Sequence, residues 1–145
     1  FYTINIAHLS LNNAPVSGSG GSAIEYIIDS GTTLNYIPTS AAAAINAAFV
    51  PPAKYSAAGG AYIVACNATV PAVSVVIEGT AFPIHALDMV LRNSDGTCVS
   101  AWNDGGASSS RDLYILGEAF MKNVVSLFDV GAASMQFAGR EFYAG

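Results

Sequence analysis

The sequence predicts a mostly β protein with two short helices. Short runs rich in β-branched and aromatic residues recur along the chain, and Gly, Pro, Asn and Ser separate them. Only two stretches, residues 38–49 and 118–123, read as helical. A chain of 145 residues is long enough for one domain with a sizeable core. We therefore expect residues 1–145 to form a single globular unit.

The N-terminal half is expected to contain strands, a loop and a helix. In order, these are a strand at 2–11, a loop or hairpin connection at 12–23, a buried strand at 26–28 and a helix at 38–49. Thr39 or Ser40 can cap the helix, and its alanines favour the helical conformation. Pro51 and Pro52 must end it.

The C-terminal half is expected to be mostly β. Its β-rich segments are 61–66, 72–79, 81–92 and 113–117, followed by a hairpin at 124–138. The pair Asp95-Gly96 predicts a tight mirror-image hairpin turn within residues 94–97. Residues 102–112 are rich in Gly and Ser and predict an exposed loop, in which Trp102 serves as a surface anchor.

Charge and hydropathy exclude several classes of function. Five basic and ten acidic residues give a net charge of -5 and a pI near 4.6. Because nucleic-acid binding needs a basic stripe, we expect no nucleic-acid partner. Every apolar run is interrupted before about 18 residues, so we expect no membrane span. His8 and His85 lack ligand-like spacing, and we expect no metal site.

Cysteine usage and a sequon indicate a secreted protein. Cys66 and Cys98 are compatible with one disulfide; the alternatives are two free thiols or half a metal site, and the lack of a Cys-x-x-Cys pair argues against zinc. Asn67 begins an Asn-Ala-Thr glycosylation acceptor. Because the chain starts at Phe1 and not at Met, we expect that it was processed from something longer. The small number of basic groups also suits an acidic medium.

One aspartate stands in an unusual place in a chain with so few charges. Asp29 directly follows the apolar strand predicted at 26–28, and a carboxylate at such a position needs hydrogen-bond donors. Residues 30–33, Ser-Gly-Thr-Thr, supply three hydroxyls and flexible backbone. An acid held by such donors stays ionised and oriented, which suits work on a water molecule. The alternative is an aspartate that merely starts and organises a turn.

Several segments together carry a resemblance to a known family. The stretch 27–33, "IIDSGTT", resembles the second catalytic motif of the pepsin-like aspartic proteases, and 114–117, "YILG", resembles the segment of that family that lies against the catalytic loop. The opening "FYTINI", the cysteine pair and the closing "SLFDVGAASMQFA" resemble the family's C-terminal lobe in order and separation. The resemblance covers nearly all of the chain. It implies one lobe of the bilobal pepsin-like fold, with residues 1–145 as the C-terminal lobe.

The resemblance also implies a reaction, the hydrolysis of peptide bonds at acid pH. Two aspartates share one proton because two such close like charges cannot both ionise. The ionised member takes a proton from a water that attacks the peptide carbonyl, and the protonated member donates to that carbonyl. By this resemblance Asp29 is one member of the pair. Since carboxylates activate the water, no cofactor is expected.

The resemblance assigns further roles around Asp29. Gly31 would offer its backbone N–H to the carboxylate and Thr32 its hydroxyl. Ser30 would join hydrogen bonds between the two catalytic loops. The positions that would face or line the substrate site are Thr33, Ile27 and Ile115. For the two isoleucines, core packing is an equally good explanation. Phe1 matches a pocket aromatic only weakly, and Glu118 stands where the family usually has Asp.

The second acid is missing from this sequence. The family's first Asp-Thr-Gly motif and its flap hairpin are absent, and the remaining aspartates lack the hydroxyl-glycine setting: Asp88, Asp95, Asp104, Asp112 and Asp129. Three explanations remain open. The chain is one part of a cleaved two-chain enzyme, or a lobe that pairs with itself, or a non-catalytic module or inhibitor that recognises a glycan or a protein. We favour the first, because Phe1 falls near where the family's second lobe begins and the high apolar fraction suits a chain with a covered face. A self-paired lobe would lack a flap, and nothing in residues 29–33 departs damagingly from the motif, which argues against a non-catalytic module.

The favoured hypothesis implies a partner chain, a class of substrate and a location. The partner would be an N-terminal lobe chain that carries the other Asp-Thr-Gly motif, which makes the enzyme a heterodimer produced from a zymogen. The substrate would be an extended peptide or protein with apolar residues beside the cut. We expect the enzyme to be secreted or to lie in an acidic vacuolar compartment.

Overall fold

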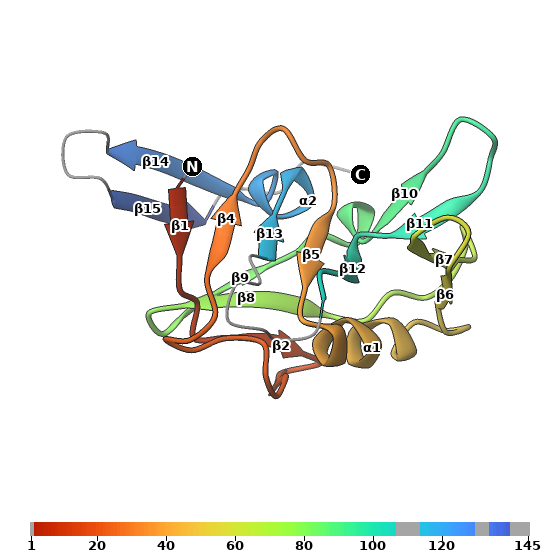
Figure 1. The fold of residues 1–145 in the computed structure, drawn as a ribbon, viewed down its shortest axis with the longest axis horizontal. Coiled ribbons are helices and arrows are strands. Elements are labelled where there is room, and N and C mark those ends of the chain that lie inside the picture. The colour runs from red at the N-terminus through yellow and green to blue at the C-terminus, as the bar shows by residue number, and fades with distance from the viewer. Residues whose placement is uncertain (1, 107–113, 130–133, 140–145) are drawn as a thin grey trace.

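The computed structural model describes residues 2–106, 114–129 and 134–139 (Figure 1). Some predictions made from the sequence fall outside these residues, among them the pocket role of Phe1, the part of the exposed loop from 107 to Asp112 and the turn of the last hairpin at 130–133. Strands dominate the described residues, with two short α-helices, α1 (Thr39–Ala47) and α2 (Glu118–Met121). The prediction of a mostly β chain with two short helices is confirmed.

A five-stranded sheet forms the centre of the fold. Its strands follow the order β1-β4-β13-β5-β12. They are β1 (Tyr2–Ile4), β4 (Tyr26–Ile28), β13 (Tyr114–Leu116), β5 (Asn35–Ile37) and β12 (Trp102–Asp104). β13 lies between β4 and β5, parallel to the former and antiparallel to the latter. The chain that leaves β4 therefore passes over the end of β13 before it returns as β5 (Figure 1).

Three smaller sheets surround the central one. The first contains β3 (Ala14–Pro15), β2 (His8–Leu11), β8 (Val73–Ile77) and β9 (Thr80–Pro83) in that order. The second contains β10 (Val90–Arg92), β11 (Cys98–Ser100), β7 (Ala61–Val64) and β6 (Lys54–Ser56). The third is the hairpin of β14 (Val124–Asp129) and β15 (Ser134–Gly139). A 3-10 helix, η1 (Ala86–Asp88), precedes β10.

The single strand predicted at 2–11 is wrong. The segment divides into β1 and β2, which belong to different sheets, and residues 5–7 connect them. The side-chain amide of Asn5 donates to the carbonyl of Ile24 at 2.8 Å, which holds this connection against the stretch before β4. The loop predicted from residue 12 begins as a hairpin turn, since Asn12 and Asn13 both have positive φ and join β2 to β3.

The long helix lies where it was predicted, but its cap does not. α1 ends at Ala47, ahead of the two prolines. Pro38 occupies the N-cap position, and no side chain caps the helix, so the expected cap by Thr39 or Ser40 is wrong. The Thr39 hydroxyl instead donates a 2.6 Å hydrogen bond to Asp104 on β12. The hydroxyl reaches a carboxylate 65 positions away because α1 packs against β12.

Trp102 is in the core, which corrects the prediction of a surface anchor. It begins β12, is fully buried and donates from its indole N–H to the sulfur of Met89 at 3.3 Å. β12 pairs in parallel with β5, a strand that the sequence did not indicate. Pairing with β5 places residues 102–104, the first residues of the predicted exposed loop, in the sheet. Residues 107–112 of that loop lie outside the described part of the chain.

The β10–β11 hairpin and its disulfide complete the second sheet. Only Gly96 in this turn has a positive φ, and Gly96 donates its N–H to Asn93, so the turn is not the predicted mirror-image type. Cys66 and Cys98 form a disulfide across 32 positions, which confirms the pairing that the sequence left open. The predicted strand at 81–92 divides into β9 and β10, with η1 between them.

Candidate active site

Asp29 lies at the edge of the central sheet, directly after β4. The loop 29–34 begins there and leads to β5. Figure 1 shows this loop as the long turn between β4 and β5. β4 and β5 place their buried side chains alternately, so Tyr26 and Ile28 are buried whereas Ile27 is half-buried. The strand predicted at 26–28 is therefore present, with Ile27 less buried than its two neighbours.

Both oxygens of the Asp29 carboxylate accept a hydrogen bond. The backbone N–H of Gly31 donates to Oδ1 at 2.9 Å, and the hydroxyl of Thr32 donates to Oδ2 at 2.6 Å. The backbone N–H of Thr32 also donates to the Asp29 carbonyl at 3.3 Å, which closes the turn. A Cβ added at Gly31 would lie 3.2 Å from Oδ1, so the absence of a side chain there lets the N–H approach the acid.

These bonds determine the charge state of the acid. The Thr32 hydroxyl contributes most, followed by the Gly31 N–H, and together they hold the pKa of Asp29 below its usual value. Partial desolvation acts in the opposite direction and is outweighed. Asp29 therefore stays ionised into more acidic solution than a free aspartate does. An ionised carboxylate in a fixed orientation can accept a proton from a water molecule.

The end of β13 and the start of α2 form hydrogen bonds with the loop 29–34. The backbone N–H of Asp29 donates to the Leu116 carbonyl at 3.1 Å, and the N–H of Glu118 donates to the Thr32 carbonyl at 2.8 Å. Between these two bonds, a Cβ added at Gly117 would overlap the carbonyl oxygens of Thr32 and Leu34. Only glycine permits this approach. The segment 114–117 thus lies against the loop, as the resemblance implied.

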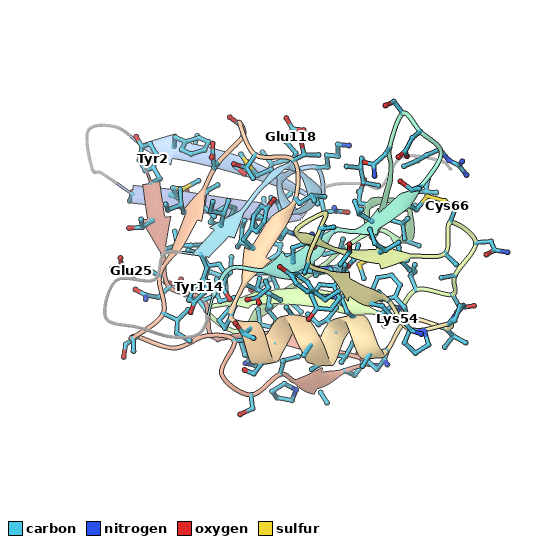
Figure 2. The ribbon with its side chains drawn as sticks, turned by 45° about the vertical axis from the view of Figure 1, so that its right-hand side comes forward. Tyr2, Glu25, Lys54, Cys66, Tyr114 and Glu118 are labelled. Atoms are coloured by element: carbon cyan, nitrogen blue, oxygen red, sulfur yellow. A yellow bond between two sulfur atoms is a disulfide. The ribbon has the colours of Figure 1, made fainter. Side chains whose placement is uncertain are left out.

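The remaining predicted positions fall into two places. Ile27 and Ile115 are direct partners on the parallel strands β4 and β13 and are both half-buried, so they share one face at the loop end of the sheet. Ser30 and Thr33 are exposed on the loop. Figure 2 shows Glu118 at the surface beside this turn, whereas Tyr114 lies inside the body of the molecule.

The cysteines and the sequon belong to a different region. Cys66 and Asn67 follow β7, and Cys98 begins β11, in the second four-stranded sheet. The side chain of Asn67 is exposed there, next to the disulfide. These residues are therefore separate from the loop that carries Asp29.

Asn35 is a residue of this region that the sequence analysis missed. It is fully buried at the start of β5, and its Oδ1 accepts a 2.9 Å hydrogen bond from the N–H of Gly117. A polar residue at an inward-facing position of a short alternating run, Asn-Tyr-Ile, was the available signal. The signal is weak because three residues do not establish a period.

Among the described residues, no hydrogen bond joins Asp29 to a second carboxylate. Asp104 is bound by Thr39 and Gly106, and Asp95 by Thr97, each in its own turn. The same residues contain no group of three or more His, Cys, Asp or Glu side chains that could hold a metal ion. No helix in the described ranges is long and apolar enough to cross a membrane.

Comparison with known proteins places this geometry in a family. The family model described as eukaryotic aspartyl protease matches residues 1–140. An Aspergillus fumigatus protein named "Probable aspartic-type endopeptidase" is 47% identical over 143 residues, which cover 95% of this chain and 32% of that protein. The embryonic pepsinogen of Gallus gallus is 32% identical over 131 residues, 89% of this chain and 32% of that protein.

A third relative gives the same result. The aspartic protease of Phaffia rhodozyma is 32% identical over 146 residues, which cover 95% of this chain and 34% of that protein. The chain thus spans about a third of the length of the relatives that it matches. The family match covers nearly the whole chain. It agrees with the loop at the end of β4, in which Gly31 and Thr32 hold the carboxylate of Asp29. The chain belongs to the eukaryotic aspartyl proteases, the pepsin-like family.

Proposed function

We propose that this chain supplies one half of the active site of an aspartic endopeptidase, with Asp29 as one of the two catalytic acids. The observation that carries the proposal is the pair of hydrogen bonds to Asp29, from the Gly31 N–H at 2.9 Å and from the Thr32 hydroxyl at 2.6 Å. They keep the carboxylate ionised in acid and leave it half-exposed at the sheet edge. A buried acid without donors would be neutral and could not act as a base.

The reaction needs a second carboxyl group opposite Asp29. The two acids share one proton, and the ionised one removes a proton from the attacking water. The attack on the peptide carbonyl forms a tetrahedral intermediate, to whose oxygen the protonated acid donates. Transfer of a proton to the nitrogen then allows the C–N bond to break. Ser30 and Thr33, exposed on the same loop, are placed to contact the facing loop and the substrate respectively.

The second acid would come from another lobe that carries the family's Asp-Thr-Gly motif. Residues 1–145 would then be the C-terminal lobe, and the other lobe a separate chain left by cleavage of a zymogen. The outer face of β14 supports contact with another body, because Val125 and Leu127, two positions apart on the same face of the strand, are each 57% exposed. Apolar side chains grouped on one strand in this way are favourable only when something covers them.

The substrate would be an extended peptide that passes over the loop 29–34. Ile27 and Ile115, side by side and half-buried at the sheet edge, would offer an apolar surface to side chains beside the cut. We propose secretion, or residence in an acidic vacuolar compartment, and a sugar on the exposed side chain of Asn67. Loss of mass from the intact protein after glycosidase treatment tests the last point.

The decisive experiment exchanges Asp29 for asparagine in the complete two-lobed protein. Asp29→Asn keeps the size and one acceptor oxygen but removes the charge, so hydrolysis of a protein substrate at about pH 3 to 5 should be abolished while assembly is unchanged. Asp95→Asn is the matched control, since Asp95 also accepts from a threonine hydroxyl and a backbone N–H, both of Thr97, but lies in a distant turn. Undiminished hydrolysis by Asp29→Asn would refute the assignment.

A non-catalytic module that binds a glycan or a protein is the second candidate. The observation in its favour is that, in the part of the chain the structure describes, no second carboxylate contacts Asp29. Intact-mass measurement under denaturing conditions separates the two candidates, because a cleaved enzyme brings a second chain of similar size. A lone chain that does not bind a pepstatin-like transition-state mimic supports the module.

A further inference from the structure

Asn35 connects two segments that are far apart in the sequence. Its Oδ1 accepts the 2.9 Å hydrogen bond from the N–H of Gly117, across 82 positions. Among the described residues, this is the one bond made by a side chain between the stretch 29–35 and the segment 116–119. The backbone N–H of Asn35 donates to the Ala101 carbonyl at 2.8 Å, so the residue is anchored at both its main chain and its side chain.

The N–H of Gly117 needs this partner. Gly117 is buried, and the backbone on each side of it is already bonded to the loop that carries Asp29. The packing is close enough that a Cβ at Gly117 would overlap two carbonyl oxygens of that loop. A buried N–H without an acceptor would be costly.

In the described part of the chain, only half of the Asn35 amide is paired. Its Nδ2 has no hydrogen-bonding partner among the described residues, although the side chain is fully buried. Burying an unpaired amide N–H destabilises a fold, and an apolar side chain of the same shape would avoid that cost only by leaving the buried N–H of Gly117 without its acceptor. Only the carbonyl half of the amide is used, and it is used at Gly117.

We propose that Asn35 is a positioning residue for the hydrolysis of peptides. By holding Gly117, it sets the segment 116–119 against the loop, and that segment in turn bonds the backbone of Asp29 and Thr32. The orientation of the Asp29 carboxylate thus depends on Asn35, which does not itself touch the substrate. This inference rests on the function proposed above.

The test compares two buried asparagines in the complete two-lobed protein. Asn35→Leu removes the acceptor with little change of volume, and kcat should fall about 100-fold while KM changes less than about threefold. Asn46→Leu is the matched control. Asn46 is also fully buried with one unpaired amide atom, but its Nδ2 bonds Ala42 and Trp102 in the core behind the sheet. It should lower stability and leave kcat unchanged.

Two further measurements complete the test. Asn35→Asp retains a carbonyl acceptor when its buried carboxyl is neutral, so at about pH 3 it should restore most of kcat. Hydrogen exchange at the Gly117 amide should accelerate in Asn35→Leu and stay slow in Asn46→Leu. An unchanged kcat or an unchanged exchange rate in Asn35→Leu overturns the proposal, as does an equal loss of kcat in Asn46→Leu.

The two proposals fail in different ways. If the unsubstituted two-lobed protein hydrolyses no peptide, the proposed function is refuted. Exchange at the Gly117 amide still decides in that case whether Asn35 holds the segment, because that readout needs no substrate.

Discussion

The hydroxyl of Thr32 donates to Oδ2 of Asp29 at 2.6 Å and is the largest single influence on the acid's pKa. Replacing Thr32 by valine retains the shape and removes the hydroxyl, so the pKa of Asp29 should rise toward its ordinary value. The acid limb of kcat/KM against pH should therefore move to higher pH. The pH profile of the complete two-lobed protein measures this, and the limb belongs to the acid pair rather than to Asp29 alone.

The matched variant is Thr32→Ser, which keeps the hydroxyl and should leave the acid limb in place. The same shift has a consequence for stability. Because the pKa of Asp29 is lower in the folded protein, the stabilisation is present above the unfolded pKa and is lost as the pH falls through the folded pKa. Thr32→Val should reduce that loss. An acid limb unmoved by Thr32→Val would contradict the role given to the hydroxyl.

Gly117→Ala should displace the loop that carries Asp29. The added Cβ would overlap the carbonyl oxygens of Thr32 and Leu34, and both are backbone atoms that cannot move aside independently. We expect a loss of stability of about 1–3 kcal/mol, measured by denaturant unfolding, together with a loss of activity. Gly139→Ala is the control: nothing lies within 4 Å of its Cβ, and the change should be within about 0.5 kcal/mol.

Trp102→Ala should destabilise the protein strongly. The side chain is fully buried and bonds the sulfur of Met89, so its removal leaves a large cavity. We expect a loss of about 3–5 kcal/mol in the free energy of unfolding. Leu87→Ala, at a side chain that is 54% exposed, is the comparison and should cost far less. A similar small effect for both would restore the surface position that the sequence suggested for Trp102.

Removing the disulfide should weaken the fold without altering the chemistry. The bond between Cys66 and Cys98 closes a loop of 32 positions, and its loss should cost roughly 3–4 kcal/mol in the chain-entropy model. The double variant Cys66→Ala/Cys98→Ala, followed by thermal unfolding, measures the cost. Because the bond lies in the second sheet and not at the loop of Asp29, the pH profile of the remaining folded protein should be unchanged. A shifted profile would indicate coupling between the two regions.

Features that depend on near neighbours in the chain were predictable. The helix α1 ends before the two prolines, α2 follows β13, and the last strands pair as a hairpin. The disulfide was also predictable, because the sequence has only two cysteines that could pair. In each case the deciding interaction is local or has a single available partner, so the residue types suffice.

Features that depend on pairing between distant strands were not predictable. Residues 2–11 alternate as one strand would, yet β1 pairs with β4 whereas β2 pairs with β8. Alternation indicates that a segment has a buried face, but it does not say which sheet buries it. β5 and β12 escaped notice because polar residues interrupt them, Asn35 in the first and Asn103 and Asp104 in the second, whereas the equally short β4 and β13 contain only apolar and aromatic residues. Trp102 was misplaced for this reason.

The sequence by itself determined that Asp29 has donors within reach, since the bonds from Gly31 and Thr32 span only two and three positions. Closing so short a turn costs little chain entropy, and the residue types settle the outcome. Only the tertiary structure decided what holds that turn in place. The bond from Gly117 to Asn35 crosses 82 positions, and it forms only when the core between β13 and β5 has packed. No local pattern can encode a contact whose existence depends on the whole fold.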